Sequence, residues 1–167
     1  MSEHSDASNY RERAYQILAC REHSAYELRQ KLERKGCPPE LAEDLVGELT
    51  EARLVVDVRF GTVLVRSKLR QGWGRQRILR ELSLRGVRGE ALEAVLSGNA
   101  EVLNPDREQE RADAIARRRL RTPADAARVM RCLIGHGFTL ACARRAVEPY
   151  IKEDFVQKDG GCAGDET

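Results

Sequence analysis

The stretch SAYELRQKLERKGCPPELAEDLV, residues 24–46, predicts a pair of helices, because its apolar residues repeat at helical spacing on both sides of one glycine. They lie eight and four residues before Gly36 and five and nine residues after it, at Leu28, Leu32, Leu41 and Leu45. Apolar residues four positions apart predict one buried helix face on each side of the glycine. Glycine adopts a positive φ without strain, so Gly36 is predicted to end the first helix of a pair.

Two later segments repeat this pattern without gaps: GRQRILRELSLRGVRGEALEAVL at residues 74–96 and DAARVMRCLIGHGFTLACARRAV at residues 125–147. Their glycines, Gly86 and Gly137, continue the register of Gly36 at spacings of 50 and 51 residues. The positions that match the four leucines again hold apolar or small residues, namely Ile78, Leu82, Ala91 and Val95, then Val129, Leu133, Cys142 and Ala146. The chain is therefore predicted to contain three copies of one helical unit.

The residue that begins each pair indicates how its first helix is capped. Ser24 is followed by Glu27 at the spacing of a capping box. Asp125 occupies the same position in the third copy and is a second N-cap candidate, whereas Gly74 in the middle copy is a weaker one.

Another helical segment precedes each pair, at residues 10–20, 60–70 and about 109–119, so each unit has three helices. RLVVDVRF, residues 53–60, is the one β-branched run, and its place between units makes it the start of a helix with Asp57 near the N-terminus. We expect an all-α array of three tandem helix-turn-helix-like repeats at residues 9–56, 57–100 and 101–152, the last with its preceding linker, and disorder at residues 1–8 and 153–167. A single irregular helical bundle is the alternative.

Charge is distributed unevenly along the chain. The net charge is only +2. Residues 11–53 are nearly balanced, with 8 basic and 9 acidic residues, whereas residues 59–88 carry 9 basic residues against the single acid Glu81. Clustered charge attracts polyanions even when the whole protein is almost neutral. The middle repeat is thus the strongest functional signal in the sequence.

Five cysteines, an odd number, with no signal peptide before them, indicate cytosolic thiols rather than a disulfide framework. No apolar run approaches the roughly 20 residues that a membrane-spanning helix needs. We expect a soluble cytoplasmic protein that does not bind membranes.

The sequence offers little that could support catalysis or hold a cofactor. His23 with Glu22 or Glu27 is a conceivable general base, but a histidine at a helix start has a simpler structural role. No phosphate-binding glycine loop is present, because GWG at residues 72–74 lacks the required pattern and follows no strand. We therefore expect neither an enzyme nor a cofactor.

A metal site in the third repeat is equally weakly supported. Cys132, His136 and Cys142 lack a fourth soft ligand and the paired Cys-x-x-Cys of structural zinc sites. In the repeat register Cys142 instead matches Leu41 and Ala91, which makes it a small core residue, and Cys132 is a thiol near the surface. We expect no metal.

Two basic clusters meet at the Gly72 to Gly74 turn, where phosphate or carboxylate groups could be held. The candidate partner-binding residues of this region are Arg66, Lys68, Arg70, Trp73, Arg75, Arg77, Arg80, Arg85 and Arg88. Trp73 is either packed under the helix junction or a partner contact, two alternatives that the sequence leaves open. Arg117, Arg118 and Arg119 add a third cluster, although cations at a helix end also serve the helix dipole.

Two runs carry a resemblance to a known family: ILACREHSAYELRQKLERKG at residues 17–36 and LTEARLVVDVRFGTVLVRSKLRQGWGRQRILRELSLRGV at residues 49–87. With them the chain resembles the RecX family, regulators of the RecA recombinase, over residues 14–150. The resemblance implies an elongated, curved array of three-helix repeats without enzymatic activity. It also implies a partner, the RecA filament on DNA, whose ATPase, strand-exchange and coprotease activities such proteins suppress in recombination and DNA repair.

We also expect DNA as a weak, non-specific second partner, and a monomeric protein. The alternative function is a helix-turn-helix-like protein that binds nucleic acid directly. The helices after the turns, at residues 38–49 and 88–96, expose mainly acidic and apolar residues, which argues against sequence-specific reading of bases.

Overall fold

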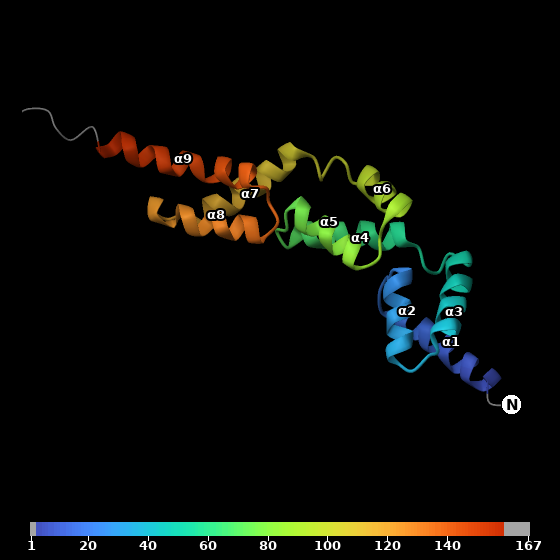
Figure 1. Ribbon diagram of the computed structural model, residues 1–167. Coiled ribbons are helices and arrows are strands. Elements are labelled where there is room, and N and C mark those ends of the chain that lie inside the picture. Colours follow the sequence, from blue (N-terminus) through green and yellow to red (C-terminus); the bar gives the residue numbers. More distant parts are fainter. Residues whose placement is uncertain (1–2, 159–167) are drawn as a thin grey trace, which may run out of the picture. The chain divides into compact units, whose positions relative to one another are not determined.

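The computed structural model describes the backbone of residues 3–158 and the side chains of residues 7–122 and 124–151. Within these residues the secondary structure is all helical (Figure 1). The helices are α1 (Glu3–Cys20), α2 (Ala25–Arg34), α3 (Pro39–Glu51), α4 (Asp57–Arg70), α5 (Arg75–Leu84), α6 (Gly89–Gly98), α7 (Pro105–Arg119), the 3₁₀ turn η1 (Pro123–Asp125), α8 (Ala126–Gly135) and α9 (Leu140–Lys158). The predicted all-α class is confirmed.

The first helix of each three-helix repeat begins earlier than the apolar pattern indicated. α4 begins at Asp57, as the RLVVDVRF run predicted, and α7 begins at Pro105. Asn104 caps α7, since its side chain accepts a hydrogen bond from the Arg107 amide at 2.7 Å, and proline is well suited to the first helical position. α1 is helical from Glu3 and α9 continues to Lys158, so parts of the two segments expected to be disordered lie in helices. Residues 1–2 and 159–167 lie outside the described residues.

The three predicted glycine turns have the expected geometry. Gly36, Gly86 and Gly137 have φ values of 89°, 81° and 89°, in the left-handed region that favours glycine. In each turn the amide after the glycine donates a hydrogen bond to the carbonyl five residues earlier: Cys37 to Leu32, Val87 to Leu82 and Phe138 to Leu133. These bonds satisfy carbonyls at the helix ends, and each residue after the glycine is buried.

Of the two predicted N-caps, Ser24 is confirmed and Asp125 is wrong. The Ser24 hydroxyl accepts a hydrogen bond from the Glu27 amide at 3.1 Å. Asp125 makes no side-chain cap to α8, because its carboxylate is turned back to the amides of Arg121 and Thr122 at 3.2 and 3.1 Å. The 3₁₀ turn η1 directly before α8 brings those amides within reach.

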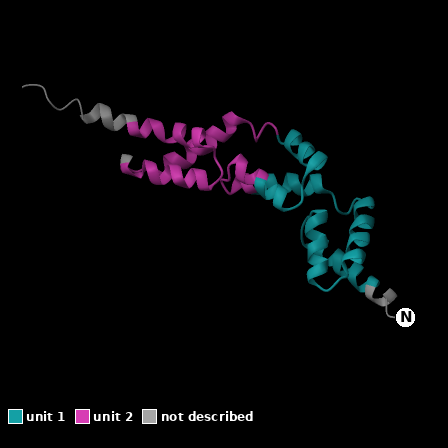
Figure 2. Ribbon diagram, in the orientation of Figure 1, with its two compact units in different colours: residues 1–67, 80–99 teal, residues 68–79, 100–167 magenta. Residues whose placement is uncertain are grey.

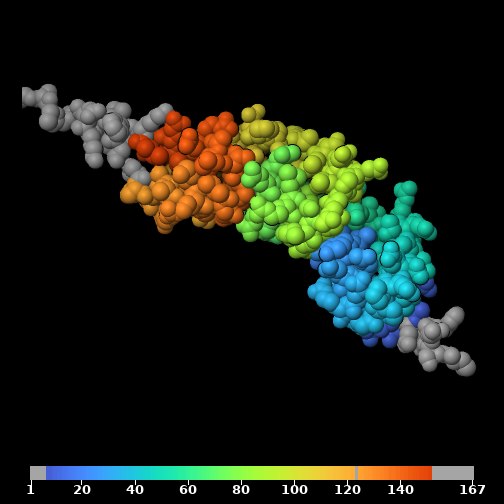
Figure 3. Space-filling model, viewed as in Figure 1, coloured from blue at the N-terminus to red at the C-terminus, as the bar shows by residue number. Residues whose placement is uncertain are grey.

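The chain divides into two compact units, residues 1–67 with 80–99 and residues 68–79 with 100–167 (Figure 2). In the first, Ala14 of α1 packs with Leu28 and Leu32 of α2 and with the buried face of α3, which holds Ala42, Leu45, Val46 and Leu49. The space-filling view shows α2 and α3, in blue and teal, side by side (Figure 3). The second core joins α7, α8 and α9, with Phe138 and Leu133 among its buried side chains. The repeat boundaries expected at residues 56 and 100 stay a prediction.

None of the described helices combines the length and the apolar character that crossing a membrane would require.

Candidate interaction surface

A hydrogen-bonded contact, which we call the first joint, connects the start of α2 to α4 and to the turn between α5 and α6. The Ser24 hydroxyl donates to the carbonyl of Arg85 at 2.5 Å, and the Ala25 amide donates to the Asp57 carboxylate at 2.9 Å. A side chain at Gly86 would overlap Tyr26, so glycine lets the start of α2 come close to the turn. The joint satisfies amide groups that every helix start leaves unpaired.

A second joint has the same construction between the start of α5, α7 and the turn between α8 and α9. The Gly74 amide donates to the His136 carbonyl at 2.8 Å, and the Arg75 amide donates to the Glu108 carboxylate at 2.9 Å. A side chain at Gly74 would overlap the backbone of Gly137. The weak cap predicted at Gly74 is therefore completed by residues that lie far along the chain.

The two joints occupy matching positions of the repeat. In each, the first amide of a second helix is bound by a carboxylate from the first helix of the following repeat, Asp57 or Glu108. In each, the glycine turn of that following repeat supplies the carbonyl acceptor, from Arg85 or His136. The same type of contact thus connects the first repeat to the second and the second repeat to the third.

The first joint carries an ion-pair network. The Arg85 guanidinium contacts the carboxylates of Glu27 and Glu81, and Arg21 donates to Glu27 at 3.0 Å. Partial burial alone would raise the pKa of Glu27, but the hydrogen bonds from Arg21 and Arg85 bring this pKa below its ordinary value. The Arg85 guanidinium is therefore paired with carboxylates of its own chain, although its side chain stays 36% exposed.

Trp73 is half-buried and carries two cations on its ring. The Lys68 ammonium lies 4.2 Å and the Arg77 guanidinium 3.7 Å from the ring centroid. Arg77 also donates to the Gly135 carbonyl at 3.3 Å. Such contacts hold the indole by cation–π attraction. Trp73 thus combines packing at the junction with partial exposure.

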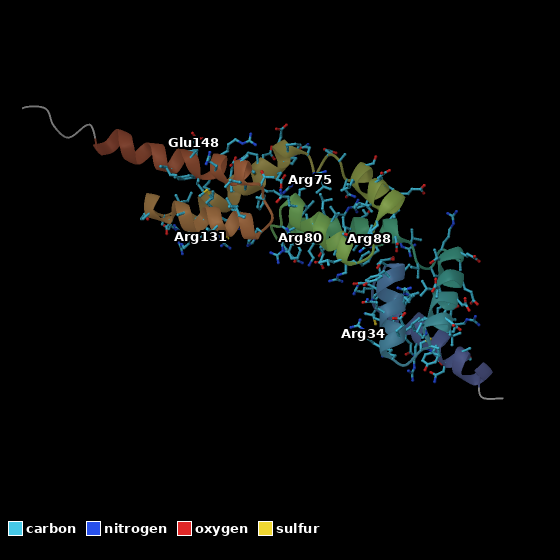
Figure 4. The ribbon with its side chains drawn as sticks, viewed as in Figure 1. Arg34, Arg75, Arg80, Arg88, Arg131 and Glu148 are labelled. Atoms are coloured by element: carbon cyan, nitrogen blue, oxygen red, sulfur yellow. The ribbon has the colours of Figure 1, made fainter. Side chains whose placement is uncertain are left out.

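The remaining candidate residues of the middle repeat are on the surface. Arg80 and Arg88 project outward from α5 and the turn that follows it, and Arg75 stands at the start of α5 (Figure 4). Within residues 7–122 and 124–151, no carboxylate lies within ion-pair distance of this exposed set, which comprises Arg66, Arg70, Arg75, Arg80 and Arg88. Arg88 makes one long hydrogen bond of 3.4 Å to the Ser83 carbonyl.

Arg117, Arg118 and Arg119 are exposed in the last turn of α7. Arg119 donates to the Cys132 sulfur at 2.8 Å, which places this half-buried thiol beside the cluster. Five further arginines of the second unit are exposed: Arg121, Arg128, Arg131, Arg144 and Arg145. Arg128 is paired with Asp125 at 2.8 Å.

The residues considered for metal binding or catalysis have structural contacts. His136 Nδ1 lies 3.1 Å from the Gly72 carbonyl in the second joint. Cys142 is buried, and burial raises the pKa of its thiol to about 11. His23 is buried between the Arg21 carbonyl and Lys31. Among the described residues no group of three or more His, Cys, Asp or Glu side chains could hold a metal ion.

Comparison with known proteins assigns the chain to a family. Residues 11–49 match the model of the first three-helix domain of RecX, and residues 57–96 match that of the second. The regulatory protein RecX of Chromohalobacter salexigens is 34% identical over 140 residues, covering 82% of this chain and 90% of that relative. The chain belongs to the RecX family.

Other RecX proteins give the same result. The regulatory protein RecX of Halorhodospira halophila is 42% identical over 103 residues, or 61% of this chain and 63% of that relative. The crystal structure of RecX from Lactobacillus salivarius superposes with a TM-score of 0.70 over 89% of this chain and 98% of that one, at 16% identity. A second structure of regulatory protein RecX gives a TM-score of 0.67 at 19% identity, over 88% of this chain and 71% of that one. The fold is that of RecX.

RecX regulatory proteins are non-enzymatic, so the residues of interest are those that can meet a partner. The matched second RecX domain contains all nine candidates of the middle repeat. The structure divides them into exposed arginines on one hand and, on the other, Arg85, Lys68, Arg77 and Trp73, which have contacts of their own.

Sequence reasoning missed the joints. The sequence predicts that Asp57 favours the start of its own helix, and it indicates no role for Glu108. The repeat register could have indicated these contacts, because Asp57 and Glu108 both lie in the first turn of the first helix of their repeats, α4 and α7.

Proposed function

We propose that the protein binds the RecA filament on DNA and inhibits its ATPase, strand-exchange and coprotease activities. Membership of the RecX family supports a regulatory role. The observation that carries the proposal is the set of exposed arginines on the second RecX domain that have no carboxylate partner within the described residues. Such cations attract the acidic patches or phosphates of a nucleoprotein filament and make binding sensitive to salt.

The filament experiment follows RecA-catalysed ATP hydrolysis on single-stranded DNA, together with co-sedimentation of the protein. We expect co-sedimentation and slower hydrolysis. The test variant replaces Arg70, Arg75 and Arg80 by alanine, because these side chains are exposed and make no ion pair with the described residues. We expect it to bind about tenfold or more weakly while its helix content stays unchanged.

A matched control replaces three exposed arginines outside the middle repeat, Arg11, Arg34 and Arg107. Two of these form exposed ion pairs, with Glu48 and Glu110, of the kind that contributes little stability. Equal loss of binding in both variants would show that only total charge matters. Unaltered hydrolysis with no co-sedimentation of the unmodified protein would refute the proposal.

Direct binding of nucleic acid is the competing function. Against sequence-specific reading, the exposed residues of α3 include Glu40, Glu43, Asp44 and Glu48, and those of α6 include Glu90 and Glu93. Acidic side chains repel the phosphates that flank a groove. We therefore expect DNA binding without RecA to be weak and steeply salt-dependent, and a salt titration checks this. Tight sequence-selective binding at physiological salt would favour the competing function.

A further inference from the structure

The turn between α2 and α3, residues 35–37, has the same geometry as the turns of the two joints but receives no helix start among the described residues. A side chain at Gly36 would meet only the Tyr10 hydroxyl, at 3.6 Å, whereas one at Gly86 or Gly137 would overlap the helix start that packs on it. Lys35 and Gly36 are exposed. The first repeat thus presents a copy of this surface on which, among the described residues, no helix start packs.

The carbonyls of this turn can still accept hydrogen bonds. The Gly36 carbonyl accepts one from Tyr10 at 2.8 Å, and the Lys35 carbonyl accepts a long one of 3.4 Å from Arg13. A carbonyl oxygen has two lone pairs, so each can take a further donor. The C-terminal end of α2 is also the negative end of its dipole, which attracts the positive end of an incoming helix.

Charge indicates which helix starts would fit. Lys35 occupies the repeat position of Arg85, which pairs with Glu27 at the third position of α2 in the first joint. No carboxylate in the described part of the chain lies within ion-pair distance of Lys35. An acidic residue at the third position of an incoming helix would pair with Lys35 in the same way.

We propose that the α2–α3 turn is a docking surface for a helix start of a partner protein. The two internal joints define its N-cap, a serine or glycine like Ser24 and Gly74. The first joint alone defines an acidic third helical residue, like Glu27, because there the residue at the position of Lys35 is the cation Arg85. In the second joint the third residue is Arg77 and the residue at the position of Lys35 is His136. The inference goes beyond the proposed function, because it concerns a protein contact outside the basic middle repeat.

A second copy of this chain does not fit the surface. Its helix start at the corresponding repeat position, that of α8, has Arg128 at the third position, which would face Lys35 with like charge. Asp125 at the N-cap position is already bound to Arg128 and to the amides of Arg121 and Thr122. The occupant is therefore a different protein.

The test titrates the ¹⁵N-labelled full chain with a peptide of residues 21–34, the helix start that occupies the first joint. A Lys–Glu lactam at positions 29 and 33, where Arg29 and Glu33 form an ion pair, holds the peptide helical. We expect saturable amide shifts at residues 35–37. Lys35→Glu should weaken binding about fivefold to tenfold, since it replaces an attraction by a repulsion. A Glu27→Lys peptide should bind Lys35→Glu protein better than unmodified protein.

Arg34→Glu is the matched control, because it makes the same charge change one residue away, at a side chain that donates to the Gln30 carbonyl of its own helix. It should change affinity less than twofold. The proposal is overturned by the absence of shifts at residues 35–37, by shifts at residues 85–87 instead, or by equal weakening in both variants. Concentration-dependent dimerisation that Lys35→Glu abolishes would overturn the assignment to a different protein. The titration contains neither RecA nor DNA, so its outcome is independent of the filament experiment.

Discussion

The carboxylate of Glu108 accepts a hydrogen bond at 2.9 Å from the amide of Arg75, 33 residues earlier in the chain. Asp57 accepts the equivalent bond from Ala25, also at 2.9 Å. A helix start that lacks a good N-cap residue of its own, as α5 does at Gly74, is completed in this way by the following repeat. Stability of the α5 start is thereby coupled to the position of α7.

Replacing Glu108 should therefore destabilise the second joint. Glu108→Ala removes a buried acceptor and leaves the Arg75 amide unpaired, at a cost of about 1–3 kcal/mol in the free energy of unfolding. Glu108→Gln keeps an acceptor oxygen and should cost less. Urea unfolding followed by circular dichroism measures both, and Glu110→Ala, at an exposed position, serves as the control. Equal midpoints for the alanine variants would contradict the role given to Glu108.

Close backbone contact at the second joint makes Gly74 intolerant of a side chain. Gly74→Ala places a methyl group against the backbone of Gly137, and we expect a loss of about 1–3 kcal/mol. Gly135→Ala is the control, since a Cβ there meets nothing within 4 Å and alanine favours helix. Measured by thermal unfolding, Tm should be lower for Gly74→Ala and unchanged or higher for Gly135→Ala. A tolerated Gly74→Ala would argue against the close contact.

The pH dependence of stability should reflect His23. Burial, with smaller contributions from the charges of Arg21 and Lys31, lowers the pKa of His23 below 6.5. The folded state therefore binds a proton less readily than the unfolded state, so stability is complete above about pH 6.5 and falls as the pH drops through the folded pKa. Urea midpoints at several pH values between about 5 and 8 measure this. His23→Leu should flatten the profile in this window, and an unchanged slope would exclude His23 as its source.

Arg85 and Glu27 should behave as a coupled pair. Arg85→Ala leaves the Glu27 carboxylate, whose side chain is 10% exposed, with Arg21 as its remaining arginine, and we expect a loss of about 1–2 kcal/mol. Because the pKa of Glu27 is lowered in the folded protein, its contribution is present above the unfolded pKa and is lost as the pH falls through the folded value. A double-mutant cycle with Glu27→Ala checks the coupling, and purely additive losses would contradict it.

Thiol reactivity should follow burial. Cys20 is exposed, whereas Cys37 and Cys142 are buried and burial raises the pKa of both thiols, that of Cys142 to about 11. The thiolate is the reactive form, so brief alkylation of the native protein at pH 8 should label Cys20 and spare the other two. Peptide mass spectrometry gives the site-resolved result. Labelling of Cys142 as fast as in urea would show that its helix opens readily.

Local pattern was sufficient for the helix pairs because each depends on residues close in sequence. Gly36, Gly86 and Gly137 end helices because glycine adopts a positive φ without strain. The four-residue spacing of the apolar side chains defines the buried faces. Asp125 failed as a cap because the 3₁₀ turn before α8 redirected its carboxylate to Arg121 and Thr122. A competing local partner of this kind cannot be read from an N-cap preference alone.

The three-helix repeats, the glycine register and the basic middle repeat follow from the amino-acid order alone, since periodicity, glycine and charge act within a few residues of each other. The folded structure was needed to show which arginines are exposed, that Lys68 and Arg77 lie over the Trp73 ring, and that Asp57 and Glu108 complete helix starts of the preceding repeat. These contacts join residues 32 or more positions apart at the two joints. The packing of the folded repeats determines which groups become hydrogen-bond partners at the joints, and the spacing of residues within one helix does not predict these pairs.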